Sequence, residues 1–466
     1  MSVPSNRASR AATSLLLLAA TGLGCSPTDN VIGAILGGRL AGVAGTGGEG
    51  ATTGGGLATA GGGETAGGGL GDSHGGTAGT VPSGSSGAGG SGGLLLATGG
   101  TAGPGDPSAG SGGLPSPRPI GDGTFLAPVE YATGESPRSV AFGDLDTDGR
   151  VDIVVANWTD GSVSTLRGWG DGTFAAHVDY AVAPETNWVA LGQLNSGQAL
   201  DMAVTSYDSD TVKVLLGEGD GTFGAVTEFT GTEDMFSVVL GDVDNDGKLD
   251  MTTSPGDIGS ASVFLGDGTG KFAQPKYFAS GGSSYAVALA DLDNDGKLDL
   301  ARVNASADTV SILFGTGDGS FGPATAYATG RHPIFVTFGD LNGDGQLDML
   351  TSDSSSDAVG VYLGTGQGAF AARVEYSAGT YPSHVCLADL NGDKHLDMIV
   401  VNTNAHSVSV RKGTGDGTFA ARVDYQVGNF PEMSAVGDLN GDDITDLVVV
   451  NSQSNSLSVF LGAPLQ

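Results

Sequence analysis

The chain has 466 residues with a formal net charge of −33, although only 15% of its residues are charged, against roughly 25% in an average soluble domain. So acidic a chain cannot replace the counterions along a phosphate backbone, which excludes a nucleic-acid partner. Glycine is the compositional outlier with 83 residues, and the length allows two or three ordinary domains or one large repeat domain.

Residues 1–25 are predicted to be an export signal. Arg7 and Arg10 precede a short apolar run at residues 15–20, which is too short to span a bilayer. The segment that ends at Cys25 resembles a bacterial lipobox, although that motif favours Leu where this chain has Gly22. The resemblance implies that Cys25 is lipidated and that a lipid anchor alone holds the protein at the outer membrane or cell surface. Secretion after cleavage is the alternative.

Residues 26–113 are predicted to form a disordered tether. They are rich in glycine, mixed with Ala, Thr and Ser, and offer too little apolar surface to offset the entropy lost on ordering. A flexible coil of this length has a root-mean-square reach of roughly 50 Å. It would hold a folded head away from a membrane.

Residues 114–466 form a strict internal repeat. An aspartate-rich motif begins at Asp144 and has counterparts that begin at positions 193, 242, 291, 340, 389 and 438, so that each step is 49 residues. A second motif, Gly-Asp-Gly-Thr-Phe or a variant of it, keeps the same spacing and begins at Gly121, Gly170, Gly219, Gly268, Gly317, Gly366 and Gly415.

Each repeat is expected to contain four short strands, which in the first repeat cover residues 139–143, 152–156, 162–167 and 174–180. Four strands at this period predict the blades of a seven-bladed, all-β propeller, with a linear solenoid as the alternative. The repeat region begins with a fourth strand near residues 125–131 and ends with a third strand at residues 458–461. The first strand is therefore expected to complete the last blade and close the ring.

The aspartate-rich loops place carboxylates or amides at alternate positions and end on a further aspartate, which is a donor set that suits calcium. The seventh position varies freely, so we expect it to contribute its backbone carbonyl. Strands flank the loop and Val155 stands where an EF-hand has its glutamate, which excludes an EF-hand. The predicted ligands are Asp144, Asp146, Asp148, Arg150, Asp152, Asp242, Asp244, Asp246, Lys248, Asp250, Asp291, Asp293, Asp295, Lys297, Asp299, Asp340, Asn342, Asp344, Gln346, Asp348, Asp389, Asn391, Asp393, His395, Asp397, Asp438, Asn440, Asp442, Ile444 and Asp446.

Three loops depart from this pattern. The second copy keeps Asp201 as its one carboxylate, so we expect about six calcium sites with this loop empty or weak. The sixth and seventh copies have Lys394 and Asp443 in place of the turn glycine, which leaves their affinity open.

Residues 121–466 resemble the FG-GAP or VCBS repeats of the integrin α-chain-like propeller family, through the calcium loops and the sequence Phe142-Gly143-Asp144. The resemblance implies a calcium-binding propeller. It is less informative about function, because the family includes adhesive ectodomains, lectins, and propellers that accompany hydrolases or lyases.

The sequence favours a non-catalytic, monomeric binding or adhesion module for a protein or glycan. It has no zinc-type histidine pair and no nucleophile elbow. A lectin is the alternative, and a polysaccharide lyase or hydrolase is the second alternative. The repeats diverge on the face opposite the calcium loops, where the candidate ligand residues are Trp158, Trp188, Tyr207, Phe236, Tyr285, His332, Phe335, Tyr381, His384, Phe430 and Glu432.

Overall fold

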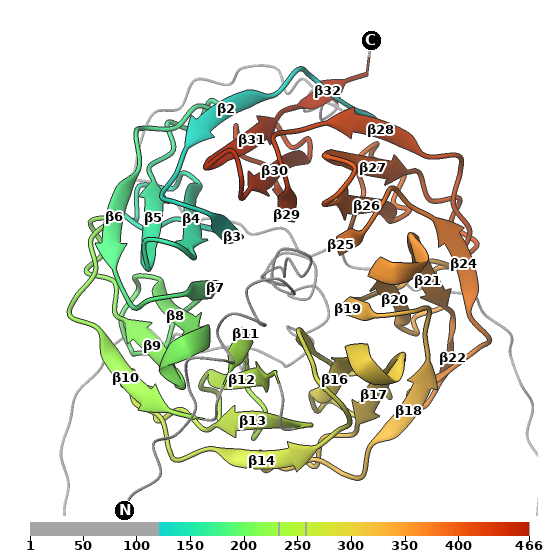
Figure 1. Cartoon of the computed structure of the whole chain (residues 1–466), viewed down its shortest axis with the longest axis horizontal. Coiled ribbons are helices and arrows are strands. Elements are labelled where there is room, and N and C mark those ends of the chain that lie inside the picture. Colours follow the sequence, from blue (N-terminus) through green and yellow to red (C-terminus); the bar gives the residue numbers. More distant parts are fainter. Residues whose placement is uncertain (1–120, 232–233, 257–258, 466) are drawn as a thin grey trace, which may run out of the picture. The chain divides into compact units, whose positions relative to one another are not determined.

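The computed structural model describes residues 121–231, 234–256 and 259–465, which form a ring of seven four-stranded antiparallel sheets (Figure 1). The predicted seven-bladed propeller is confirmed. Within the described residues no helix is long and apolar enough to cross a membrane. The segments proposed as export signal and tether, with Cys25, lie outside the described part of the chain.

The strands of the first four blades follow chain order from the axis outward. Blade 1 contains β3 (Pro137–Gly143), β4 (Asp152–Asn157), β5 (Ser162–Leu166) and β6 (Val178–Ala181). Blade 2 contains β7 (Thr186–Gly192), β8 (Asp201–Ser206), β9 (Thr211–Leu215) and β10 (Thr227–Thr230), with the 3-10 helix η1 (Tyr207–Ser209) after β8. Blade 3 contains β11 (Met235–Gly241), β12 (Asp250–Pro255), β13 (Ser260–Phe264) and β14 (Lys276–Ala279). Blade 4 contains β15 (Val287–Ala290), β16 (Asp299–Asn304), β17 (Thr309–Leu313) and β18 (Thr325–Ala328), with η2 (Ala305–Ala307) after β16.

The last three blades keep this arrangement. Blade 5 contains β19 (Pro333–Gly339), β20 (Asp348–Asp353), β21 (Ala358–Tyr362) and β24 (Val374–Ser377), with η3 (Ser354–Ser356) and the small hairpin β22 (Gly364–Gly366) and β23 (Ala369–Phe370). Blade 6 contains β25 (Pro382–Ala388), β26 (Asp397–Asn402), β27 (Ser407–Arg411) and β28 (Val423–Gln426). Blade 7 contains β29 (Pro431–Gly437), β30 (Asp446–Asn451), β31 (Ser456–Phe460) and β2 (Val129–Ala132).

Both ends of the described chain meet in blade 7 and close the ring. Strand β2 pairs with β31, from Val129 opposite Val459 to Ala132 opposite Ser456. Next to this pair, β1 (Gly121–Phe125) pairs with β32 (Gly462–Pro464). The predicted closure is confirmed, and it removes the exposed edge strands that an open array would leave.

Aromatic pairs explain the phenylalanine of the Gly-Asp-Gly-Thr-Phe motif. The ring of Phe223 in blade 2 meets Tyr180 of blade 1 edge-on at 5.5 Å between ring centroids. Every boundary between blades has such a pair, at 5.2–5.6 Å. Because Phe174 serves this contact, it forms only an isolated bridge with Gly168. The fourth strand of blade 1 is therefore shorter than expected and begins at Val178.

Candidate metal loops and ligand face

The aspartate-rich loops connect the first and second strands of each blade and are wrapped around their first aspartate. Asp144 Oδ1 accepts the backbone N–H of Asp148 at 3.0 Å, and its Oδ2 accepts that of Gly149 at 2.8 Å. The first aspartates of the third and fourth loops accept the equivalent two bonds. In these three loops the backbone is therefore folded around the carboxylate of the first aspartate.

Three loops form acidic clusters that fit a calcium ion. One carboxylate oxygen from each of three residues lies within 4.8 Å of the others in the clusters Asp144, Asp146 and Asp152; Asp242, Asp244 and Asp246; and Asp291, Asp293 and Asp295. The side chain of Asp146 is only 6% exposed, and its Oδ1 accepts no hydrogen bond. A buried acceptor of this kind is costly unless a cation or donor satisfies it, so the donor set fits the predicted metal.

The last aspartate of every loop also has a structural role that sequence reasoning missed. Asp152 Oδ2 accepts the N–H of Leu145 at 3.0 Å, and Oδ1 accepts that of Gly168 at 2.8 Å, which fastens the loop to the end of the third strand. The other six blades repeat both bonds through Asp201, Asp250, Asp299, Asp348, Asp397 and Asp446.

Burial raises the pKa of all seven of these carboxyl groups. The pKa reaches about 7 for Asp299 and about 6 for Asp250, Asp397 and Asp446, despite the backbone hydrogen bonds and because neighbouring loop carboxylates add repulsion. A signal of the structural role was present in the sequence, since Asp201 is the one carboxylate that the degenerate second loop retains.

The second loop is closed by side-chain amides instead of an acidic cluster. Asn195 Nδ2 donates to Asp201 Oδ1 at 3.1 Å, and Gln193 Nε2 donates to the carbonyl of Gln198 at 3.3 Å. In the fifth, sixth and seventh loops, the amides of Asn342, Asn391 and Asn440 donate to the carboxylate two residues later. That the second loop is empty or weak, and that the chain has about six calcium sites, remains a prediction.

The sixth and seventh loops keep the turn without its glycine. Lys394 and Asp443 adopt left-handed φ angles of 69° and 64°, where Gly149 has 82°. Such a conformation costs a side-chain-bearing residue roughly 1 kcal/mol. In every loop except the second, the backbone N–H of the seventh-position residue donates to the fifth-position carboxylate. The carbonyl role assigned to Arg150, Lys248, Lys297, Gln346, His395 and Ile444 remains a prediction.

Five of the eleven candidate ligand residues are buried, so the expectation that they are presented to a ligand needs correction. They are Trp188, Phe236, Phe335, His384 and Glu432, with exposures of 7% or less. Trp188 of blade 2 stacks on Phe335 of blade 5 with ring centroids 6.4 Å apart, and His384 meets Phe335 at 4.5 Å. Trp188 and Phe335 belong to the main hydrophobic core, and His384 packs against it, so all three are hidden from solvent.

The other six candidates, Trp158, Tyr207, Tyr285, His332, Tyr381 and Phe430, are partly exposed. Four of them join Phe236 in a continuous run of ring contacts, which we name the aromatic arc: Trp158, Tyr207, Phe236, Tyr285 and His332. Successive ring centroids along the arc lie 5.7, 4.9, 5.0 and 5.6 Å apart. The arc crosses five consecutive blades on the side of the ring away from the aspartate-rich loops.

The seam between blades 7 and 1 adds a charged pair to this face. Arg138 Nη1 donates to Glu432 Oε1 at 3.1 Å, and the Arg138 guanidinium lies 4.9 Å from the ring of Trp158. Burial raises the pKa of Glu432 to about 7. Sequence analysis did not select Arg138. It could have been found because its position differs in every repeat. The equivalent residues around the ring are Arg138, Asn187, Phe236, Tyr285, Ile334, Ser383 and Glu432.

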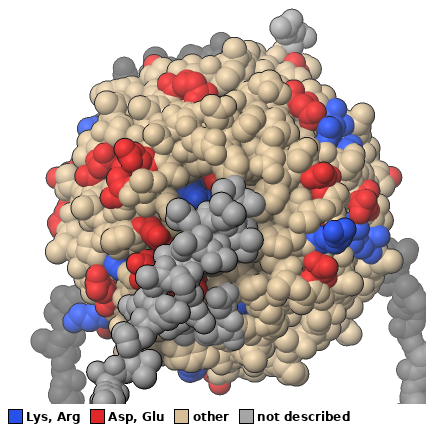
Figure 2. Space-filling model, viewed as in Figure 1, with Lys and Arg blue, Asp and Glu red and all other residues tan. Residues whose placement is uncertain are grey.

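Charged groups on the face of the molecule in Figure 2 form small patches separated by neutral surface. No single-sign field covers the part of that face contributed by described residues. Selectivity on such a surface depends on individual side chains rather than on bulk charge.

The FG-GAP-like repeat family matches the chain at residues 194–253, 252–302, 302–351, 340–400 and 389–449. No curated protein matches.

Solved structures with the same fold include BBS1N in a complex with ARL6DN, with a TM-score of 0.53, 12% identity, and coverage of 72% of this chain and 96% of that chain. A putative 6-phosphogluconolactonase from Bacteroides fragilis has a TM-score of 0.52, 16% identity, and coverage of 69% and 95%. An Agrocybe aegerita lectin that recognises non-reducing terminal N-acetylglucosamine has a TM-score of 0.50, 20% identity, and coverage of 69% and 86%. At these identities the similarity is one of fold alone.

Proposed function

Because the chain belongs to the FG-GAP-like repeat family and folds as a closed seven-bladed propeller, we propose that it is a calcium-stabilised, non-catalytic binding or adhesion module. Its ligand is a protein or glycan that docks on the face opposite the metal loops. The module is exported and held at the cell surface through lipidated Cys25 and the glycine-rich tether.

The observation that carries this proposal is the aromatic arc. Four of its five rings are partly exposed, whereas the positions equivalent to Trp158 and Tyr207 in blades 5 to 7 are the buried Ser354, Thr403 and Ser452. The arc lies next to the buried Arg138–Glu432 pair, because the Arg138 guanidinium contacts the ring of Trp158. Aromatic surfaces with nearby polar groups are typical of recognition sites.

A carbohydrate ligand is the second candidate, and the same arc favours it. A partly exposed ring offers an apolar face to a sugar while its polar edge and neighbouring hydroxyls offer hydrogen bonds. A polysaccharide lyase or hydrolase is the remaining alternative, and turnover of acidic polysaccharides by the full chain would reveal it.

Calcium would be held by the carboxylates of the first, third and fourth loops, with the mixed Asp and Asn loops as further sites. The ion would neutralise mutually repelling carboxylates and tie the first strand of a blade to the second. It would stabilise the scaffold without touching the ligand, since the loops lie on the other face.

A glycan array and a cell-surface binding screen of the full chain, with and without calcium, test the proposed function. Trp158→Ala and Tyr207→Ala should each weaken binding at least tenfold. Trp169→Ala is the matched control, because Trp169 is 50% exposed and follows β5 on the metal-loop side. Equal losses in all three variants, or ligand turnover, would contradict the proposal.

A further inference from the structure

A buried packing position, which we call the seat, recurs where neighbouring blades meet on the metal-loop side. The residue after the third strand of one blade inserts its side chain under the second glycine of the next blade's Gly-Asp-Gly turn. A Cβ placed on Gly270 would lie 2.7 Å from Leu216, and one placed on Gly319 would lie 2.6 Å from Leu265. The remaining filled seats place Phe314 under Gly368, Leu363 under Gly417, Lys412 under Gly123 and Leu461 under Gly172.

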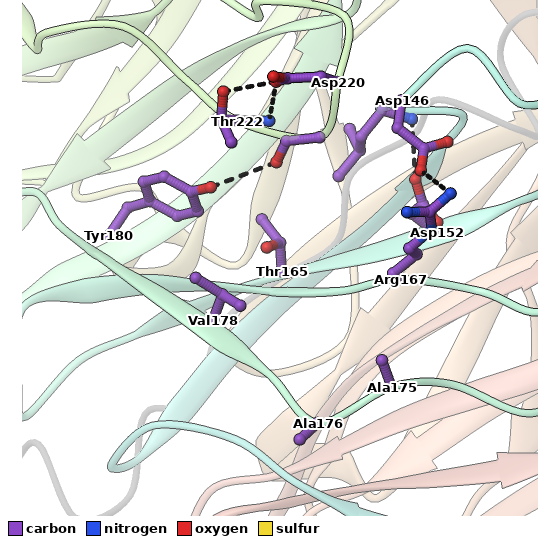
Figure 3. A pocket seen from close by; sticks show the side chains of 12 residues that line it. Asp146, Asp152, Thr165, Arg167, Ala175, Ala176, Val178, Tyr180, Asp220 and Thr222 are labelled. Atoms are coloured by element: carbon purple, nitrogen blue, oxygen red, sulfur yellow. Dashed lines mark hydrogen bonds and ion pairs between the residues drawn. The ribbon is translucent and has the colours of Figure 1, made fainter.

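The seat between blades 1 and 2 is the exception among the seven. Its residue is Arg167, and the nearest atom to a Cβ on Gly221 is Cβ of Asp146, 3.5 Å away. In place of a packed side chain there is a cavity of about 320 Å³. Ala175, Ala176, Val178 and Tyr180 line its apolar side (Figure 3).

The Arg167 side chain extends to the first metal loop instead of packing under Gly221. Its Nη2 lies 2.7 Å from Asp146 Oδ2 (Figure 3). The same Nη2 lies 2.9 Å from Asp148 Oδ2, so one guanidinium bridges two predicted ligands. The third and fourth loops differ. There Lys248 and Lys297 each lie 2.5 Å from a single carboxylate within their own loop, on Asp246 and Asp295. Among the described residues, only the first loop has a side chain from outside the loop that bridges two of its carboxylates.

The seat can hold a long cationic side chain. Lys412 fills the equivalent position between blades 6 and 7, where its Cε would lie 2.6 Å from a Cβ on Gly123. Its ammonium group donates to the carbonyl of Asp122 in the Gly-Asp-Gly turn. The same arrangement for Arg167 would place its stem under Gly221 and its guanidinium near the turn that contains Asp220.

We propose that Arg167 is a tethered cation that competes with calcium for the first loop and that has two positions. Without metal it neutralises Asp146 and Asp148. When calcium takes these carboxylates, the Arg167 side chain moves into the seat under Gly221 and fills the cavity between blades 1 and 2. This inference rests on the proposed calcium role. Competition from Arg167 makes the calcium affinity of the first loop lower than its four carboxylates alone would imply.

Terbium luminescence excited through tryptophan tests the inference on the full chain. Trp169 lies beside Arg167, with the guanidinium 6.0 Å from its ring, so it reports on the first loop. Arg167→Leu removes the competitor and supplies the residue that four other seats carry. Because this variant removes both ion pairs that occupy the loop carboxylates, terbium binding at this loop should tighten about tenfold. Arg167→Lys, which can pair with one carboxylate at a time, should give an intermediate change.

Arg150→Leu is the matched control, because Arg150 carries the same charge and contacts Asp148 at 3.0 Å but does not reach Asp146 in the structure. It should tighten binding by less than about threefold, as expected for a single exposed pair. Equal changes in Arg150→Leu and Arg167→Leu, or no change in Arg167→Leu, would overturn this inference alone. Calorimetry that detects no calcium binding at any loop would overturn the proposed metal role together with it.

Discussion

The two faces of the propeller are built on the same strands but differ in how far they repeat. On the metal-loop face, the last aspartate of each loop makes the same two backbone bonds in all seven blades, including the blade whose other predicted ligands are lost. On the opposite face, the equivalent position is Trp158 in one blade and Thr403 in another. A repeated carboxylate can therefore serve the fold as well as a metal, whereas a partly exposed, varied side chain is a better guide to a ligand.

The strongest test of a structural role for the repeated aspartate is to remove it from the loop where no metal is expected. Asp201→Ala should destabilise the full chain by about 2 to 4 kcal/mol, because the buried N–H of Leu194 and the N–H of Gly217 lose their acceptor. Chemical denaturation in excess chelator measures this.

Ser196→Ala in the same loop is the control. Its side chain is exposed, so the change should stay within about 0.5 kcal/mol. A similarly small effect of Asp201→Ala would mean that the repeated aspartate is retained for metal alone.

A second pair of variants separates a complete loop from a degenerate one. Asp295→Ala removes a carboxylate from the fourth-loop cluster, whereas Asn195→Ala changes a loop that has no such cluster. Calorimetry should count one ion fewer for Asp295→Ala, with a stability loss of about 2.7 kcal/mol at calcium concentrations one hundred times Kd. Asn195→Ala should leave the count unchanged. An equal loss of bound ions in both would show that the ligand pattern is wrong.

The smallest expected effect is on the ligand face and depends on pH. Burial raises the pKa of Glu432 from 4.5 to about 7, so the folded state holds this proton more tightly than the unfolded state. The contribution of this proton to the free energy of unfolding is full below pH 4.5 and is lost as the pH rises through 7. Relative to Glu432→Gln, the natural protein should lose about 2.5 kcal/mol between pH 4.5 and 7, in saturating calcium so that the loop aspartates stay ionised. Parallel pH profiles would contradict this.

The sequence predicted the fold well because strand spacing and turn chemistry recur in every repeat. Closure of the ring followed from the unmatched strands at the two ends, and β2 with β31 confirms it. The fourth strand was misplaced because Phe174 has strand-like character but packs on Tyr131 across a blade boundary.

The ligand face was harder to predict because the spacing of residues in the repeat does not show how deeply each side chain is buried. Trp188 and Phe236 lie one residue apart in the repeat, and both are buried, the first against Phe335 across the ring. Arg167 was missed for a related reason. Its partners Asp146 and Asp148 are 21 and 19 residues away in sequence, and only the fold shows a cavity under Gly221.

Thermal unfolding of the full chain in saturating calcium and in excess chelator tests the central claim most directly. The loops hold many of the carboxylates behind a net charge of −33, and metal binding to the folded state alone stabilises it by mass action. We expect chelation to lower the Tm by several degrees and re-addition of calcium to restore it. An unchanged Tm, with elemental analysis showing that the metal has been removed, would contradict a structural role for calcium in this propeller.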